Sequence, residues 1–419
     1  MSIFALGEHI LYTRTDGRGR TFVYHYYDEV TWVVLALAAA WVVWLLARAY
    51  LRARRLRRPP RRRDKGLLKQ VVRAKRDLSR TFLRPGFSAN IHAVGVGLLG
   101  GRPGEYCIQV FVADAGAELS AGIVAEDLPD FYRGFPVVML EMDALVFLSG
   151  EGSGESSHRD KFPGGIREPQ EVLVGGVSGA NTNLSGESGT IGYFCTRRSR
   201  LPRRREIYLL SNCHVFVDLR KCAVDEGDLI MHPSPGEAAT GRPVATLVNF
   251  SALKFDGGTD DPNHIDAALA KLWGPQKHAP LLPYVGAVEG HVARGEVEPG
   301  EAARKFGRTT GYTEGRVLSI HLDIWIRYAR TGQSAYFEDQ ILVEPSPGYE
   351  RFVAGGDSGS LLVDGGRHAL GLIFAGTSDV PPARAETDAS ADRPTRVEGC
   401  GVANPIAEVL DRLKIELVV

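Results

Sequence analysis

The sequence predicts a mainly β protein in which one membrane-spanning helix and a small α/β domain precede a larger body of β-structure. Three observations predict this. The 419 residues include 48 Gly and 23 Pro but only 4 Met, a composition that suits a turn-rich β protein. Short apolar runs bounded by turn residues recur along the second half of the chain. One stretch near the N-terminus carries no charge over 18 residues.

The uncharged stretch, residues 30–47, reads VTWVVLALAAAWVVWLLA. At about 1.5 Å per residue a helix of this length spans about 27 Å, close to the roughly 30 Å hydrocarbon core of a bilayer. A signal peptide is disfavoured because the basic residues follow the apolar stretch and no small-residue cleavage site closes it. A buried core helix is the alternative. We predict a transmembrane helix over residues 30–50, with residues 1–29 as a short extracytoplasmic tail.

The distribution of charge predicts the orientation of this segment. Residues 48–65 contain nine Arg, one Lys and one Asp, a charge of +9 in a chain whose formal net charge is zero. Only three Arg precede the apolar stretch. Because basic residues stay on the cytoplasmic side, we expect a single-pass protein of the inner (cytoplasmic) membrane with its C-terminal part in the cytoplasm. The polybasic linker, residues 51–65, either contacts anionic lipid or serves as a stop-transfer flank alone. A localised basic belt does not indicate a nucleic-acid-binding domain.

Cysteine usage agrees with a reducing compartment. Five cysteines, an odd number, lie scattered at 107, 195, 213, 222 and 400. Secreted small domains instead carry paired sets, so we predict free, buried thiols here. No Cys/His spacing matches a zinc site, and we expect neither a metal nor a cofactor.

The middle of the chain predicts a small α/β domain over residues 66–150. Apolar residues recur at helical spacing from Gly66 to Phe82, and three strand-like runs follow, for which we expect an antiparallel sheet. Gly95, Gly97 and Gly100 fit the pattern G-x-G-x-x-G, but a turn and a strand follow them where a dinucleotide site needs a helix. We therefore expect a hairpin there, and a polar linker over residues 151–172.

Three motifs in the second half of the chain contain candidate catalytic residues. LLSNCHVF contains His214, NHIDAALAKL contains Asp266 and VAGGDSGSLLVD contains Ser358. A serine hydroxyl is a poor nucleophile at neutral pH and needs a neighbouring base, which His214 would supply. A buried carboxylate at Asp266 would orient the imidazole and stabilise it when it is protonated. The motifs thus predict a His-Asp-Ser catalytic triad.

Asp260 and Asp261 compete with Asp266 for the third position. Asp266 is favoured because an apolar run follows it and Ile265 precedes it, which suits a buried carboxylate. His264 is expected on the surface or in a loop. The glycines around Ser358 let the backbone turn tightly. The N–H groups of Gly356 and Ser358 would then form an oxyanion hole.

The runs around these motifs predict strands. They are REIYLL before His214, AALAKL after Asp266, and SLLVD and HALGLIF after Ser358, the last two as a hairpin around Gly365–Gly366. The run NPIAEVLDRLKIEL, residues 404–417, has helical spacing after an Asn-Pro start.

From about Val174 to Leu413 the chain resembles the trypsin/chymotrypsin-like serine peptidases, in particular bacterial members. The strings GGDSGSLL, LSNCHV and IDAALAKL carry the resemblance, together with GTIGYF as a first core strand and KFGRTTGYTEGRV as a second-barrel strand and turn. It implies a chymotrypsin-like double β-barrel over residues 173–419 with a C-terminal helix. It also implies a serine endopeptidase that cleaves a protein substrate through an acyl-enzyme.

The chain departs from this family around the specificity pocket. Phe352 stands six residues before the nucleophile, where trypsin-type enzymes carry an aspartate, so cleavage after Arg or Lys is not expected. The segment Ile373–Gly376 walls the pocket in the family, and here Phe374 replaces a small residue beside Gly376. These departures indicate a narrowed or reshaped pocket. The alternative to an enzyme is a membrane-tethered interaction module with a silent protease fold. The sequence specifies neither the substrate nor the oligomeric state.

Overall fold

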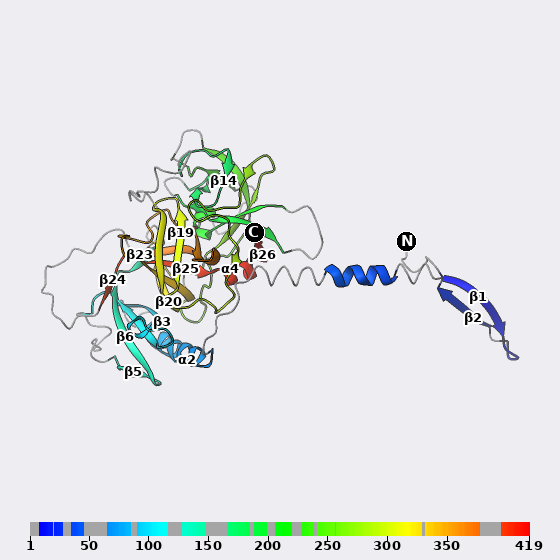
Figure 1. Cartoon of the computed structure of the whole chain (residues 1–419), viewed down its shortest axis with the longest axis horizontal. Helices are drawn as coiled ribbons and strands as arrows, with labels where there is room; N and C mark the ends of the chain where they lie inside the picture. Colours follow the sequence, from blue (N-terminus) through cyan, green and yellow to red (C-terminus); the bar gives the residue numbers. More distant parts are fainter. Residues whose placement is uncertain are drawn as a thin grey trace. The chain divides into compact units, whose positions relative to one another are not determined.

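A computed structural model describes residues 8–19, 21–27, 35–45, 65–84, 90–115, 128–147, 166–184, 188–198, 206–219, 228–235, 237, 241–255, 257–328, 332–377 and 395–419 (Figure 1). The chain separates into two compact units, Met1–Leu56 and Arg57–Val419.

The first unit contains an antiparallel hairpin of β1 (Glu8–Thr15) and β2 (Thr21–Tyr27), followed by a helix over residues 35–45. Apolar side chains of this helix are exposed, among them Leu37 and Val43, each at 65%. No helix in the described part of the chain is both long enough and apolar enough to cross a membrane. Residues 30–34 and 46–50 of the predicted transmembrane helix, and all of the polybasic linker except Lys65, lie outside the described residues.

The second unit is mainly β, as the sequence predicts. One of its sheets has the order β10-β14-β15-β16-β13-β12-β26, and all its strands pair antiparallel. Among the described residues no pairing joins its two edges. The strands are β10 (Ala180–Asn181), β14 (Leu229–His232), β15 (Arg242–Phe250), β16 (Ala268–Leu272), β13 (Tyr208–Ser211), β12 (Tyr193–Arg197) and β26 (Ile415–Leu417). Beside it β9 (Val177–Ser178) pairs with β11 (Thr190–Ile191), and β8 (Val172–Leu173) with β17 (Lys277–His278).

In the second, larger sheet, the pairing closes into a ring. Its order runs β19-β22-β23-β25-β21-β20, and β20 pairs with β19 again. Closed pairing is therefore present in the second of the two predicted barrels. The strands are β19 (Ala302–Gly307), β22 (Leu361–Asp364), β23 (His368–Thr377), β25 (Gly401–Pro405), β21 (Ser334–Pro345) and β20 (Gly311–Arg327), with the short β18 (Gly290–His291) alongside β23.

The middle segment extends this sheet outward from β20. The added strands are β3 (Ile91–Leu98), β4 (Tyr106–Val112), β6 (Phe135–Met142) and β24 (Arg396–Val397), and β5 (Phe131–Tyr132) pairs with β6. The 3-10 turn η2 (Leu99–Gly101) joins β3 to β4, so the predicted hairpin is confirmed. The expected all-antiparallel sheet is wrong, because β4 and β6 pair parallel. Parallel neighbours need a long connection, and residues 113–134 separate the two strands along the sequence.

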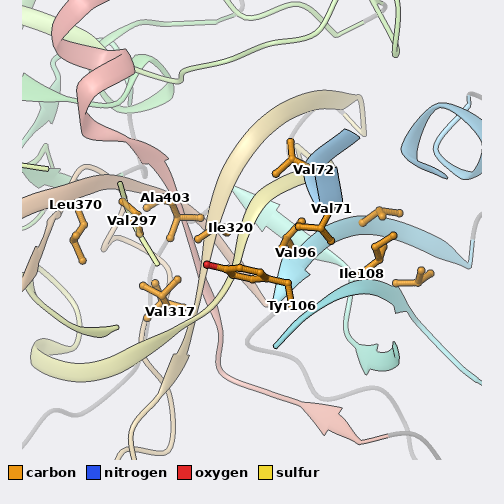
Figure 2. Packing of buried hydrophobic residues seen from close by; sticks show 14 of the residues in the cluster. Val71, Val72, Val96, Tyr106, Ile108, Val297, Val317, Ile320, Leu370 and Ala403 are labelled. Atoms are coloured by element: carbon orange, nitrogen blue, oxygen red, sulfur yellow. The ribbon is translucent and has the colours of Figure 1, made fainter. Parts of the chain in front are cut away.

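Helix α2 (Lys65–Phe82) agrees with the predicted helix and shares a core with the ring. Its Val71 and Val72 belong to the same buried cluster as Val96 of β3 and Val317 and Ile320 of β20 (Figure 2). The described residues of α2 and β3 thus share this core with the ring. After β6 the chain forms β7 (Leu145–Phe147), which pairs with both β20 and β23.

Two local predictions need correction. The run GTIGYF is divided at Gly192 between β11 and β12, which lie in different sheets, because the backbone at Gly192 passes close to Gly359. Helix α4 (Ile406–Leu413) ends before the predicted Leu417, since Lys414 adopts a left-handed conformation with φ 55° and β26 follows.

The predicted free, buried thiols are confirmed for Cys107, Cys195, Cys213 and Cys400, whereas Cys222 lies outside the described residues.

Candidate active site

His214 lies on a one-turn helix, α3 (Cys213–Phe216), directly after β13. Its side chain is buried, and the ring Nδ1 is hydrogen-bonded to a carboxylate oxygen of Asp266. The backbone N–H of His214 donates to the other oxygen, Asp266 Oδ1, at 3.2 Å. These two bonds fix both the position of the imidazole and the nitrogen that carries its proton when neutral. The structure thus brings these two predicted residues together.

Asp266 precedes β16 and is held by neighbours on two other segments. Asn212 Nδ2 donates a hydrogen bond to the backbone carbonyl oxygen of Asp266 at 2.7 Å. The backbone N–H of Asp266 donates to Asn404 Oδ1 at 2.9 Å. Asn404 Nδ2 in turn donates to Gln340 Oε1 at 2.7 Å. The competing Asp261 is exposed and pairs with Lys254 at the surface. Asp266 therefore occupies the position that orients His214.

Ser358 lies in the turn between β21 and β22 and is buried. Its Oγ donates to the carbonyl oxygen of Phe374 at 3.1 Å. The other ring nitrogen of His214, Nε2, is buried and has no hydrogen-bond partner among the described residues. The bond from serine to histidine is therefore absent here. Catalytic hydrogen bonds are often long in a free enzyme and shorten only with substrate bound.

A short chain of backbone contacts joins the loops of His214 and Ser358. Thr190 N–H donates to the Ser358 carbonyl at 2.8 Å, and Ser211 Oγ donates to the Thr190 carbonyl at 2.7 Å. Glycine makes this close approach possible, because a Cβ on Gly192 would lie 2.1 Å from the carbonyl oxygen of Gly359.

The loop around Ser358 contains two backbone N–H groups of interest. Gly356 has φ +96° and Gly359 has φ +95°, left-handed values that favour glycine. Within the described residues, the N–H groups of Gly356 and Ser358 donate no hydrogen bond. The Gly356 carbonyl is instead held by Thr190 Oγ1 at 2.9 Å. Neither N–H group is therefore engaged by another described residue, and their role as an oxyanion hole stays a prediction.

Asp357, between these two donors, anchors the loop from inside. Its carboxylate contacts Lys305 Nζ at 3.1 Å and accepts from Thr310 Oγ1 at 2.7 Å and from the Thr309 N–H at 2.8 Å. Burial alone would raise the pKa of Asp357, but the Lys305 ammonium and the hydrogen bonds from Thr310, Thr309 and Ala354 together lower it. The carboxylate thus stays ionised and fixes the turn around Ser358.

The predicted pocket residues lie in different surroundings. Phe352 is completely buried in the core that α2 shares with the ring. Phe374 belongs to another cluster and packs against Phe337 with ring centroids 4.7 Å apart. Gly376 lies opposite Val146 of β7. Of the three, Phe374 contacts Ser358 directly, through its carbonyl oxygen.

Several site residues were not predicted from the sequence. Lys305 and Thr310 lie in the string KFGRTTG, which predicts a strand and turn but gives no sign of a buried ion pair. Asn404 is the first residue of the predicted helix over residues 404–417, so the sequence did not indicate a role in the site. Phe147, whose ring centroid lies 5.0 Å from that of His214, is 67 residues away along the chain and carries no local signal. No group of three or more His, Cys, Asp or Glu in the described ranges is arranged to hold a metal ion.

Comparison with known proteins gives matches among solved structures alone. No family model matches the sequence, and no curated protein matches it. Protease A of Thermobifida fusca is 17% identical, with a TM-score of 0.37, and the match covers 59% of this chain and 99% of that protein. Cellulomonas bogoriensis chymotrypsin is 16% identical, with a TM-score of 0.36, covering 59% and 98%. A glutamic acid specific serine protease is 15% identical, with a TM-score of 0.38, covering 59% and 100%. At these values the likeness assigns no function to this chain.

Proposed function

We propose that the chain is a serine endopeptidase that acts through a His-Asp-Ser triad and an acyl-enzyme. One observation carries the proposal. A buried imidazole is held by a buried carboxylate, with its second nitrogen unpartnered within the described residues, beside a serine loop that presents two unused N–H groups. This set of groups is what acyl transfer by a serine requires.

The residues would act in the following order. The Ser358 hydroxyl turns from the Phe374 carbonyl to His214 Nε2, loses its proton to it and attacks the substrate carbonyl carbon. The N–H groups of Gly356 and Ser358 stabilise the resulting oxyanion. His214 then protonates the leaving amine, and the acyl-enzyme forms. His214 next takes a proton from water as the water oxygen attacks the ester, and then returns a proton to Ser358 Oγ as the carboxylic acid product leaves.

The same proposal includes a membrane anchor and a cytoplasmic protease domain. The apolar composition of residues 30–47 and the nine Arg that follow support it, together with the exposed apolar side chains of helix 35–45. The Arg-rich run would contact anionic lipid. We propose a particular protein as the substrate, and regulation of the activity, because an uncontrolled protease in the cytoplasm would be harmful.

Labelling with an alkyl fluorophosphonate tests the activity. The full-length chain in membranes should be labelled covalently, and Ser358→Ala should abolish the label. His214→Ala should slow it strongly, while substitution of the half-buried His278 to Ala should not. A label that persists in Ser358→Ala would overturn the assignment of the nucleophile.

One observation favours a second function, that of a silent interaction module. The Ser358 hydroxyl is bonded to a carbonyl and not to His214, and both side chains are buried. Absence of labelling in the folded full-length chain, with membranes present, would support the module. A reporter fused after Val419 tests the topology separately, because external protease in intact cells should not reach it.

A further inference from the structure

The short strand β7 lies against the candidate active site. Its three residues pair antiparallel with the end of β23, with Leu145 opposite Thr377, Val146 opposite Gly376 and Phe147 opposite Ala375. The residue that precedes Ala375 is Phe374, whose carbonyl accepts the hydrogen bond from Ser358. A strand that runs along β23 in this direction therefore ends beside the nucleophile.

Phe147, the last residue of β7, covers the catalytic base. Its ring centroid lies 5.0 Å from that of His214, with the planes tilted by 55°. It also lies 5.2 Å from the ring of Tyr328 and 6.1 Å from that of Phe374. His214 is 1% exposed and Phe147 is 3% exposed. An aromatic side chain thus fills the space where a substrate residue would approach the imidazole.

An extended peptide binds well to a free strand edge, because its backbone completes the hydrogen-bond ladder while alternate side chains enter pockets. The edge of β23 that leads to Ser358 would suit such a peptide. Residues of this chain occupy it. The other side of β7 is also taken, since Val146 lies opposite Arg327 of β20.

We propose, on the basis of the protease function above, that Leu145–Phe147 is an internal substrate mimic. It fills the strand site beside Ser358 and holds the protease latent. The site accordingly takes extended apolar segments of protein that place an aromatic side chain against His214. A substrate of this kind reaches Ser358 by displacing β7 from the edge of β23.

The size of β7 suits reversible displacement. It has three residues, is separated from β6 by only two, and is followed by the predicted polar linker. A segment of three residues can open locally at a fraction of the free energy of global unfolding. Ser358 would then react only in the open population, and the observed rate falls by the fraction that is open.

The test compares labelling rates of the full-length chain with an alkyl fluorophosphonate. Phe147→Ala should be labelled about tenfold faster than the unmodified chain or more, as expected if the open form is a minor population of at most ~10%. The matched control is Phe131→Ala, because Phe131 lies in β5 of the same segment and is 65% exposed. It should be labelled at the rate of the unmodified chain.

A second measurement uses the unmodified chain, so it does not depend on the folding of a variant. A peptidyl phosphonate with the sequence Leu-Val-Phe-Leu, that of residues 145–148, is attached to Ser358, and backbone hydrogen exchange is followed. Amides of Leu145–Phe147 should lose protection, whereas the small alkyl probe should leave them protected.

The outcomes separate the two proposals. The proposal of an internal substrate mimic is wrong if the unmodified chain is labelled as fast as folded Phe147→Ala. It is also wrong if the amides of Leu145–Phe147 stay protected when the peptidyl probe is bound. Neither result contradicts the proposed protease function. If no probe labels Ser358 in any folded variant, the protease function itself is overturned.

Discussion

Lys305 Nζ lies 3.1 Å from a carboxylate oxygen of Asp357, and neither side chain is exposed. Two charges buried this deeply are tolerated only when hydrogen bonds satisfy their remaining atoms. Thr310 Oγ1 supplies one of these bonds at 2.7 Å, and backbone N–H groups supply others. Since Asp357 adjoins Ser358, this buried pair positions Ser358.

Replacement of Thr310 by Val should affect both stability and reactivity. It removes one hydrogen bond to a buried carboxylate, which costs about 1–3 kcal/mol of unfolding free energy. The loop shifts as well, and a displacement near 1 Å lowers the labelling rate by about 100-fold. Urea unfolding and fluorophosphonate labelling measure the two effects.

The matched control is Thr313→Val. Thr313 is also buried, and its hydroxyl donates to the Phe352 carbonyl at 2.8 Å, away from Asp357. It should lose a similar amount of stability with no change in the labelling rate of the folded protein. Equal labelling rates for the two variants would show that the buried pair does not position Ser358.

The pH dependence follows from the same carboxyl. The pKa of Asp357 in the folded protein lies below its ordinary value of 3.8, chiefly because Lys305 and the hydrogen bonds outweigh the effect of burial. The folded state therefore favours the ionised form more than the unfolded state does. This contribution to stability is present above pH ~4 and is lost as the pH falls through the folded pKa.

Thr310→Val isolates this contribution from those of other carboxyl groups. Without the hydroxyl the folded pKa of Asp357 should rise, so the variant begins to protonate at a higher pH. The stability difference between the two proteins should then be constant near neutrality and shrink below pH ~4. Unfolding midpoints measured from pH 3 to 7 check this, and a difference independent of pH would contradict it.

Local patterns predicted the strands and the triad motifs because each depends on neighbouring residues. The run before His214 and the run after Asp266 form β13 and β16, and helix α2 follows its apolar spacing. What the sequence did not predict depends on contacts between distant segments. Asn404 reaches Asp266 across 138 residues, and β7 reaches β23 from a part of the chain assigned to another domain. The register of such pairs is set by packing and is not encoded in any one segment.

The choice of Asp266 as the orienting carboxylate gives another prediction. Asp266→Asn should lower the labelling rate by about 10⁴, because an amide in place of the carboxylate favours the wrong histidine tautomer. Asp261→Asn, at the exposed pair with Lys254, should leave the rate unchanged. Rates would be compared at equal folded fractions, judged by circular dichroism. A large loss in Asp261→Asn would instead restore that residue as the candidate.

The approach of two glycines gives a steric test. A Cβ on Gly192 would lie 2.1 Å from the carbonyl oxygen of Gly359, and 3.0 Å from that of Leu210. Both obstacles are backbone, so the nucleophile loop itself must move. Gly192→Ala should cost about 1–3 kcal/mol of unfolding free energy as overpacking, and should slow labelling of Ser358. Gly274→Ala is the control, since nothing lies within 4 Å of its added Cβ, and it should change neither quantity. If Gly192→Ala is destabilised yet labelled at the normal rate, the loop positions Ser358 independently of the contact between Gly192 and Gly359.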